Sequence, residues 1–343
     1  QCIRVTTFML GCALLVHNNA DVILVGFVEI ASVTLATLCL MTMQHRKVAP
    51  LRLRFAMHKL IDLLREGAAI GAGAICWALF QYAPLLILAA MVGMAETGYF
   101  GAAHRLGVSL VTFSWLYHFN LYPVISRRVA GKPEALVKLT RMSIRATAWG
   151  GIGLALALTL CAEPLLRLLF GPGFERAAGP FSILVWTFPL TLLSGHARWI
   201  LIASKHGNDM LISQIAGVAA AIPAAWLLIG PAGLGPLGAA SAMSLACLVV
   251  WAVSQVYTHI RGHDVPVLPA LPAIAVAAVI IFAAHALALN PWLALGAGMA
   301  VFLVAAFAFD HHLIDELTHL AKGEPPSAFT AQNSQPAPEG AKL

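Results

Sequence analysis

The sequence predicts an all-α, polytopic membrane protein with about ten transmembrane helices. Of its 343 residues, 60% are apolar and only 10% are charged, and the mean hydropathy is +0.83. An average soluble domain is closer to half apolar and a quarter charged, so the excess is what a lipid-facing surface requires. The apolar runs are continuous and do not alternate, which favours helices over a transmembrane barrel.

Ten apolar segments approach the roughly 20 residues that a helix needs to cross a bilayer. They are 3–16, 22–43, 66–90, 99–122, 143–162, 178–203, 209–229, 237–259, 268–288 and 292–309. The first is short and the chain begins with Gln1 rather than Met, so we expect a chain whose start is missing. Small residues at packing spacing, such as Gly67 with Gly71 and Gly238 with Ala242, are expected to let helices approach closely.

Basic residues gather on one side of this layout. With residue 1 in the cytoplasm and the segments alternating, 18 of the 21 Lys and Arg fall inside and only Arg167 and Arg176 fall outside. The remaining one, Arg105, lies within a span. This bias predicts a multi-pass protein of the cytoplasmic (inner) membrane with both termini in the cytoplasm. It also explains the net charge of +6 without a nucleic-acid partner.

Two cytoplasmic segments have a distinctive composition. In 44–65 the apolar residues follow a helical stripe with basic neighbours, which predicts an amphipathic helix on the membrane surface, against anionic lipid headgroups. A solvated connector is the alternative. The tail, 310–343, is expected to be mostly disordered after residue 322, because it becomes rich in Pro, Ser and Gln.

The sequence lacks the common signatures of catalysis. It has no phosphate-binding loop, no dinucleotide-binding loop after a strand and no nucleophile with a neighbouring base. Its six Cys lack metal-ligand spacing and its 13 His are scattered. We therefore expect neither an enzyme, nor a cofactor, nor a metal site.

Ionisable residues inside the membrane are the candidate functional groups. Arg105 lies about 10 Å below the outer end of its span, at a rise of 1.5 Å per residue, which is deep for a side chain that reaches back to the interface. It is the first candidate for a cation facing a cavity, with His104 second and Arg198 third. The alternatives are that Arg105 reaches the interface or pairs with Glu29, at a similar depth, and that Arg198 reaches the cytoplasmic interface.

Four fragments, in chain order, resemble a known family over about residues 60–260. They are "MVGMAETGYFGAAHRL", "LYPVISRR", "EPLLRLLFGPGFERAAGPFSIL" and "GPLGAASAM". Together they resemble the bacterial O-antigen and polysaccharide flippases of the multidrug/oligosaccharidyl-lipid/polysaccharide exporter superfamily. That resemblance implies two six-helix lobes around a central cavity, often followed by two further helices.

On this resemblance, 1–43 would be the last two helices of a truncated first lobe and 44–65 a basic linker. Residues 66–260 would be the second lobe, and 261–309 the additional helix pair. About four helices of an incomplete two-lobe exporter would then precede this chain. Many relatives carry an acid late in the first helix of a lobe, whereas "FQYAPLLILAAMVG" has none. This departure argues against an Asp-based proton or sodium site here.

The function implied by the resemblance is translocation of an undecaprenyl-pyrophosphate-linked oligosaccharide for polysaccharide or lipopolysaccharide biosynthesis. Arg105, His104 and Arg198 would bind the pyrophosphate, and a glycosyltransferase or polymerase of the same pathway would be a partner. One alternative is a drug or cation antiporter of the same superfamily, for which Glu29 is the intramembrane acid. Another is a membrane subunit of a polysaccharide synthase that transports nothing itself.

Overall fold

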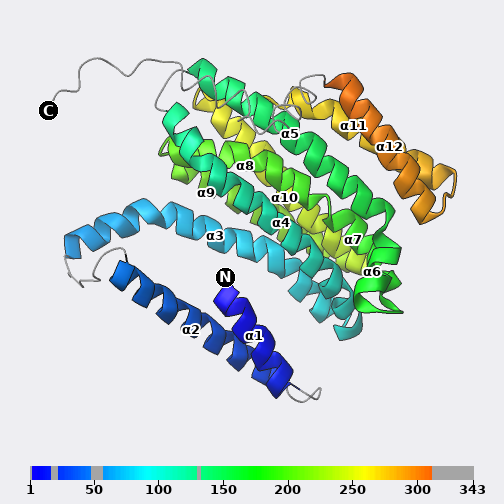
Figure 1. Ribbon diagram of the computed structural model, residues 1–343, viewed down its shortest axis with the longest axis horizontal. Helices are drawn as coiled ribbons and strands as arrows, with labels where there is room; N and C mark the ends of the chain where they lie inside the picture. Colours follow the sequence, from blue (N-terminus) through cyan, green and yellow to red (C-terminus); the bar gives the residue numbers. More distant parts are fainter. Residues whose placement is uncertain (1, 17–21, 48–56, 130–132, 311–343) are drawn as a thin grey trace. The chain divides into compact units, whose positions relative to one another are not determined.

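The computed structural model describes residues 2–16, 22–47, 57–129 and 133–310, and in these ranges it contains helices and no strand (Figure 1). The chain divides into two compact units, 1–64 and 65–343. An all-α polytopic membrane protein is thereby confirmed as the fold class.

The first unit contains two helices that pack along each other, α1 (Cys2–Leu15) and α2 (Val22–Lys47). The two helices approach closely at Gly11, where an added Cβ would lie only 2.5 Å from Val28 Cγ1. An ion pair between Arg4 and Glu29 joins the same two helices. Glu29 therefore has a basic partner within its own unit.

The helix α3 (Met57–Met91) runs across the boundary between the units. The second half of the predicted 44–65 linker is thus the first part of α3, whereas 48–56 lies outside the described residues. Beyond Leu64, α3 packs into the second unit through buried Phe80 and Leu88, which are 2% and 0% exposed. The assignment of the ranges to lobes and a linker stays a prediction.

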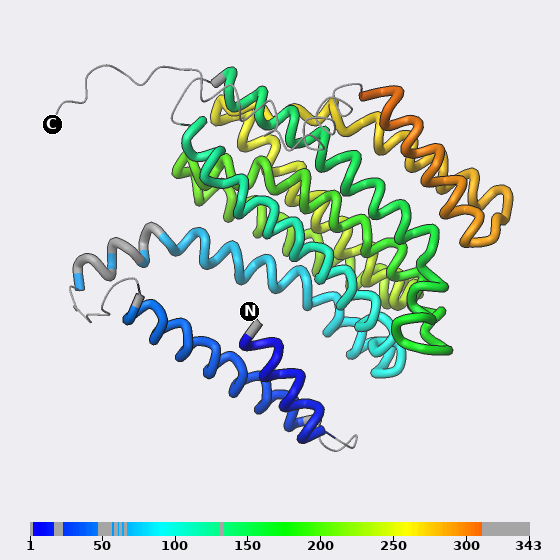
Figure 2. Tube along the Cα trace, viewed as in Figure 1, coloured from blue at the N-terminus to red at the C-terminus, as the bar shows by residue number. Residues whose placement is uncertain are grey.

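The second unit continues with a bundle of helices (Figure 2). Its elements are α4 (Met94–Val129), α5 (Pro133–Leu160), α6 (Ala162–Phe170), η2 (Phe174–Ala177), α7 (Ala178–Leu184), α8 (Thr187–Ala203), α9 (Gly207–Ile229), α10 (Gly235–Ile260), η3 (Leu268–Ala270), α11 (Leu271–Ala286) and α12 (Pro291–Phe309). The helix α8 contacts α4, α5, α9 and α10, while α11 and α12 pack on each other and on α5.

Local residues set the ends of several helices. Gly93 turns the chain between α3 and α4 at φ +117°, a conformation that side chains with a Cβ rarely adopt. Asn290 caps α12 by accepting a 3.0 Å hydrogen bond from the Trp292 backbone N–H, and Pro291 follows it at the first helical position. Past α10, Arg261 Nε donates to Asp209 Oδ2 at 2.6 Å, and this bond raises the pKa of Arg261.

The two larger of three buried clusters join most helices of the bundle. One joins α4, α5 and α8 to the α11–α12 pair, and Trp149 and Phe302 meet in it edge to face with ring centroids 5.2 Å apart. The other joins α3, α4, α7 and α10 around Phe100, Phe181 and Met243. Lipid tails are as apolar as these side chains, so close packing and hydrogen bonds between helices stabilise such a bundle more than removal from water does.

The closest backbone approach among these contacts is between α9 and α10. A Cβ at Gly238 would lie 2.7 Å from the backbone carbonyl of Leu228, and Ala242 is fully buried. The packing expected at Gly238 is therefore present. The expectation for Gly67 and Gly71 is not met among the described residues, where a Cβ at either would meet nothing within 4 Å. There α3 makes its close contact at Gly73, against Met210.

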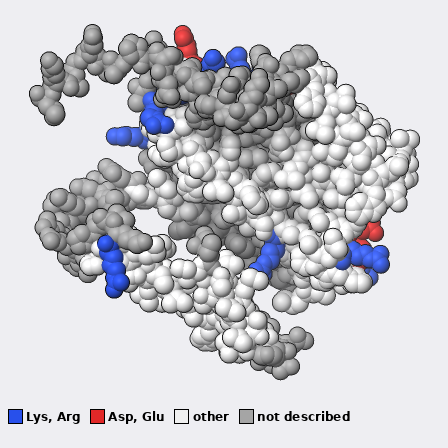
Figure 3. Space-filling model, in the orientation of Figure 1, with Lys and Arg blue, Asp and Glu red and all other residues white. Residues whose placement is uncertain are grey.

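Eight helical segments within the described ranges are long and apolar enough to cross a membrane. The helix α1 is too short to qualify, and α4, which carries His, Asn, Ser and Arg among its apolar residues, is not one of the eight. Figure 3 shows one face of the molecule, on which charged side chains are few. The ten predicted segments are all helical, but α1 and α4 differ from ordinary spans.

We predict that Gly238→Ala destabilises the bundle by about 1–3 kcal/mol, because its Cβ meets backbone that cannot move aside without separating α9 from α10. The measurement is the midpoint temperature at which the detergent-solubilised protein ceases to be monodisperse. The matched control is Gly150→Ala on α5, where a Cβ meets nothing within 4 Å. Equal midpoints for the two variants would contradict the close approach.

Candidate functional site

The exposed face of α4 carries a stripe of polar residues. The exposed polar residues at helical spacing are Arg105, Ser109, Thr112, Asn120 and Arg127. Phe113, Leu116 and Phe119 are exposed on α4 as well, whereas the large side chains exposed on α12, such as Val301, Val304 and Phe307, are all apolar. The α4 stripe is therefore the surface of the second unit best suited to face water or a polar ligand.

Arg105 is the most distinctive residue of this stripe. Its side chain is exposed, and its guanidinium makes no ion pair or hydrogen bond within the described part of the chain. It lies 11 residues after Met94, the first residue of α4, which is about 16 Å along the helix axis. A guanidinium that lies within a bilayer needs water or an anion beside it.

His104 points away from that stripe. It is 6% exposed and lies between Tyr82 of α3, with ring centroids 5.5 Å apart, and Phe100, at 6.0 Å. Its Nε2 has no hydrogen-bond partner among the described residues. The structure therefore places His104 and Arg105, which are adjacent in sequence, in different environments.

Arg198 lies on α8 with its guanidinium carbon 5.0 Å from the centroid of the Trp115 ring, a cation–π contact. The Trp115 ring in turn contacts Trp77 at 5.9 Å and Phe119 at 6.0 Å. Trp115 is ten residues after Arg105 on α4, which is about 15 Å along the axis. Arg105 on α4 and Arg198 on α8 are thus separate positive groups, and Arg198 meets α4 at Trp115.

A buried chain of hydrogen bonds lies behind the polar stripe and joins α4, α5 and α8. Tyr117 Oη is 2.5 Å from Ser143 Oγ, which is 2.6 Å from His196 Nε2. His196 Nδ1 is 3.0 Å from the Leu192 carbonyl. A carbonyl only accepts, so Nδ1 carries the proton and Nε2 accepts from Ser143. The Ser143 hydroxyl then accepts from Tyr117, which fixes the direction of the whole chain.

His118 packs edge to face on His196, with ring centroids 5.0 Å apart. Gly195 makes room for it, because a Cβ there would meet the His118 ring. The His118 Nδ1 donates to the Ser114 carbonyl at 2.7 Å. The sequence shows only scattered histidines and did not reveal this pairing, since no local pattern connects residues on α4 and α8.

In the part of the chain that the structure describes, no group of three or more His, Cys, Asp or Glu could hold a metal ion. The candidate site consists of three arginines (Arg105 and Arg127 on the stripe and Arg198 beside Trp115), the hydroxyl and amide groups of the stripe and the aromatic surface around Trp115.

No protein-family model and no curated protein matches the sequence. Solved structures do match. The lipid II flippase MurJ, in an inward closed conformation, superposes with a TM-score of 0.68 at 13% identity, over 91% of this chain and 67% of MurJ. A MOP-superfamily transporter from Pyrococcus furiosus gives a TM-score of 0.52 at 13% identity, over 72% of this chain and 64% of that one.

This chain has the fold of those transporters. An outward-facing multidrug-resistance MATE transporter of the MOP superfamily also matches, with a TM-score of 0.49 at 15% identity, over 72% of this chain and 64% of that one. The chain spans about two thirds of the length of the solved transporters that it matches. At such low identity the likeness concerns the fold, which agrees with an exporter-type bundle.

We predict that Ser143→Ala lowers the stability of the protein by about 1–2 kcal/mol, because it removes hydrogen bonds that join three helices and leaves the buried His196 Nε2 without a donor. The measurement is again the midpoint temperature in detergent. Thr147→Val is the matched control, since the Thr147 hydroxyl bonds only to carbonyls of its own helix. If both variants melt alike, the chain of bonds does not couple the helices.

Proposed function

We propose that this chain is part of a flippase that moves an undecaprenyl-pyrophosphate-linked oligosaccharide across the cytoplasmic membrane for polysaccharide biosynthesis. The observation that carries the proposal is Arg105, an exposed arginine without a partner among the described residues, deep along a helix of a MurJ-like fold. MurJ is itself named as the flippase of a lipid-linked substrate, lipid II.

The chemistry of the substrate fits the stripe on α4. A pyrophosphate presents several anionic oxygens, which a guanidinium can bind in pairs through its planar fork. Ser109 and Thr112, within two turns of Arg105, donate their hydroxyl protons to carbonyls of α4. Their oxygens could therefore accept hydrogen bonds from sugar hydroxyls of the head group. Arg198 on the Trp115 ring would offer a second cation further along the path. In this mechanism the lipid tail stays in the bilayer while the polar head crosses through the protein.

Movement would follow from rocking one half of a two-lobe transporter against the other. The buried bonds among α4, α5 and α8 would keep these helices together as one body during such a movement. Arg105 projects from that body, so its exposure could alternate between the two sides of the membrane. His104, packed between aromatic rings, would support the position of α4 more than it would touch the head group.

We further propose that both termini and the basic loops are cytoplasmic, where anionic headgroups would attract the Lys and Arg of 44–65 and 123–142. A glycosyltransferase or polymerase of the same pathway would be the partner at that face. The antiporter alternative is weaker, because Glu29, the acid that it would use, is paired with Arg4.

We predict that Arg105→Ala in the complete protein lowers surface polysaccharide at least about tenfold while protein levels stay near normal. Transport falls because one charge-assisted contact to the substrate is lost. Protein levels stay normal because removal of the Arg105 side chain leaves no described residue without its partner. Arg105→Lys should fall between, because it keeps the charge but loses the planar fork. The measurement is complementation of a cell whose own flippase gene is deleted, with immunoblots for protein level.

Arg176→Ala is the matched control, because Arg176 is also exposed but lies in the short η2 helix away from the stripe. It should complement like the unaltered protein. The rival role for Arg105, a structural pair with Glu29, predicts depleted protein in each single variant and recovery in Glu29→Ala with Arg105→Ala. Such mutual rescue would refute substrate binding by Arg105.

We predict that the two ends of α9 lie on opposite sides of the membrane. A Cys at Asn208, near its start, should be labelled from the cytoplasm, and a Cys at Ala232, just beyond its end, from outside, because both positions are exposed. The measurement uses a membrane-impermeant thiol reagent on intact cells and inverted vesicles, with native cysteines replaced. Labelling of both positions from the same side would contradict a spanning α9.

A further inference from the structure

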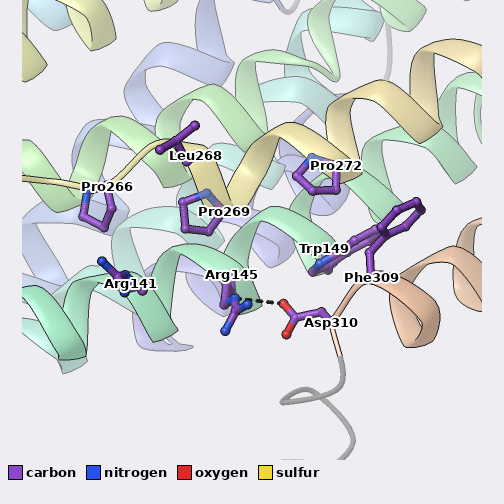
Figure 4. A pocket seen from close by; sticks show the side chains of 9 residues that line it. All are labelled: Arg141, Arg145, Trp149, Pro266, Leu268, Pro269, Pro272, Phe309 and Asp310. Atoms are coloured by element: carbon purple, nitrogen blue, oxygen red, sulfur yellow. Dashed lines mark ion pairs between the residues drawn. The ribbon is translucent and has the colours of Figure 1, made fainter.

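A cavity of about 350 Å³ lies in the second unit, away from the polar stripe of α4. Its wall comes from α5, from the segment that leads through η3 into α11, and from the end of α12. Arg141 and Arg145 of α5 line it together with Asp310, and Arg145 points toward Asp310 (Figure 4). Three prolines and three large apolar side chains form the rest of the wall.

The charges of the side chains that line this cavity do not sum to zero. Arg145 Nε is 3.2 Å from Asp310 Oδ2, so these two form an ion pair. Arg141 lies one helical turn before Arg145, on the same face of α5, and has no ion pair or hydrogen bond among the described residues. The cavity therefore holds one more positive than negative charge, and it is suited to a ligand with a single negative charge.

Asp310 places a second, independent requirement on the ligand of this cavity. Only 4% of its surface is exposed, and while Oδ2 accepts from Arg145, Oδ1 is buried without any partner in the described structure. A buried carboxylate oxygen without a donor is costly, so a ligand that brings an O–H or N–H to this point would be favoured. The ligand should thus combine an anion with a hydrogen-bond donor.

The remaining wall is suited to hydrocarbon. Leu268 is 77% exposed and Phe309 is 64% exposed, and both line the cavity. The exposed apolar surface continues along the adjoining helices, for example at Leu271 of α11 and Phe307 of α12. A ligand with a polar head in the cavity and long apolar chains would place those chains on this surface.

We propose that this cavity binds the headgroup of one anionic phospholipid of the phosphatidylglycerol class. Its phosphate lies between Arg141 and Arg145, a glycerol hydroxyl donates to Asp310 Oδ1, and its acyl chains cover Leu268 and Phe309. The charge surplus decides against phosphatidylethanolamine, which carries no net charge, and phosphatidylcholine also lacks a hydrogen-bond donor. Basic pockets between transmembrane helices are common sites for anionic headgroups.

Such a lipid would join elements that are otherwise held by apolar contacts. The α11–α12 pair packs on α5 through the cluster around Trp149 and Phe302, and the headgroup would bridge the same three helices at one end. Because a ligand that binds only the folded state stabilises it, phosphatidylglycerol should raise the midpoint temperature of the protein. This role is independent of the proposed substrate.

The test is native mass spectrometry of the delipidated full chain with added phosphatidylglycerol or phosphatidylcholine. We expect one retained phosphatidylglycerol per chain and at least about tenfold weaker retention in Arg141→Ala, because a charge-assisted contact to phosphate is lost. Lys138→Ala is the matched control, since it removes one positive charge from the exposed surface of α5 without touching the cavity. It should retain the lipid normally.

A second pair of variants tests the mouth of the cavity without altering the arginines. Leu268→Glu should lower retention by repelling the phosphate, whereas Leu268→Gln should retain most of it. Equal retention of the two lipids, or no difference between Arg141→Ala and Lys138→Ala, would overturn the proposal. So would displacement of the lipid by millimolar inorganic phosphate, which would indicate a site for a free anion, and so would a full chain that binds no phosphatidylglycerol.

Discussion

A charged side chain within a bilayer must find water or a counter-charge, and this requirement organises much of the described structure. Arg4 pairs with Glu29, Arg145 with Asp310, and Arg261 with Asp209. Arg198 lies instead on the face of an indole ring. Each contact joins two different elements, so charge neutralisation also ties helices together.

Arg105 and Arg141 are among the arginines outside this pattern, because neither guanidinium makes such a contact in the described residues. Arg105 belongs to a polar stripe at mid-helix, whereas Arg141 belongs to a cavity rich in apolar groups. The two surroundings suit different anions. A hydrated pyrophosphate head fits an open polar face, and a phosphodiester with attached acyl chains fits a pocket that continues into apolar surface.

Much of the fold could be predicted from the sequence, because a spanning helix is encoded locally. Each of the ten apolar segments is helical, and the Gly238–Ala242 spacing marks a real contact between α9 and α10. The same spacing at Gly67 and Gly71 marks no contact with another described residue, because small residues permit a close approach but do not supply the neighbour. In α3 the contacts come from Gly73 and from larger residues such as Phe80.

The surroundings of the site residues could not be predicted in the same way. The depth of Arg105 follows from counting along a helix, but the contact of Arg198 with Trp115 depends on how α8 packs against α4. Ser143 and His196 are 53 residues apart, and no periodicity relates them. The cavity at Arg141 needs Asp310, which lies beyond the last predicted span and would read as part of a polar tail from sequence alone.

The positions of these groups suggest a division between rigid and exposed parts of the second unit. Hydrogen bonds in a medium without water are broken only at a cost, so the Tyr117–Ser143–His196 chain favours one fixed arrangement of α4, α5 and α8. A lipid bound between α5, α11 and α12 would extend that rigid body on its other side. Conformational change would then move this body as a whole, and the surroundings of the α4 stripe would change with it. A charge such as Arg105 can exchange water for substrate there without disturbing the packing behind it.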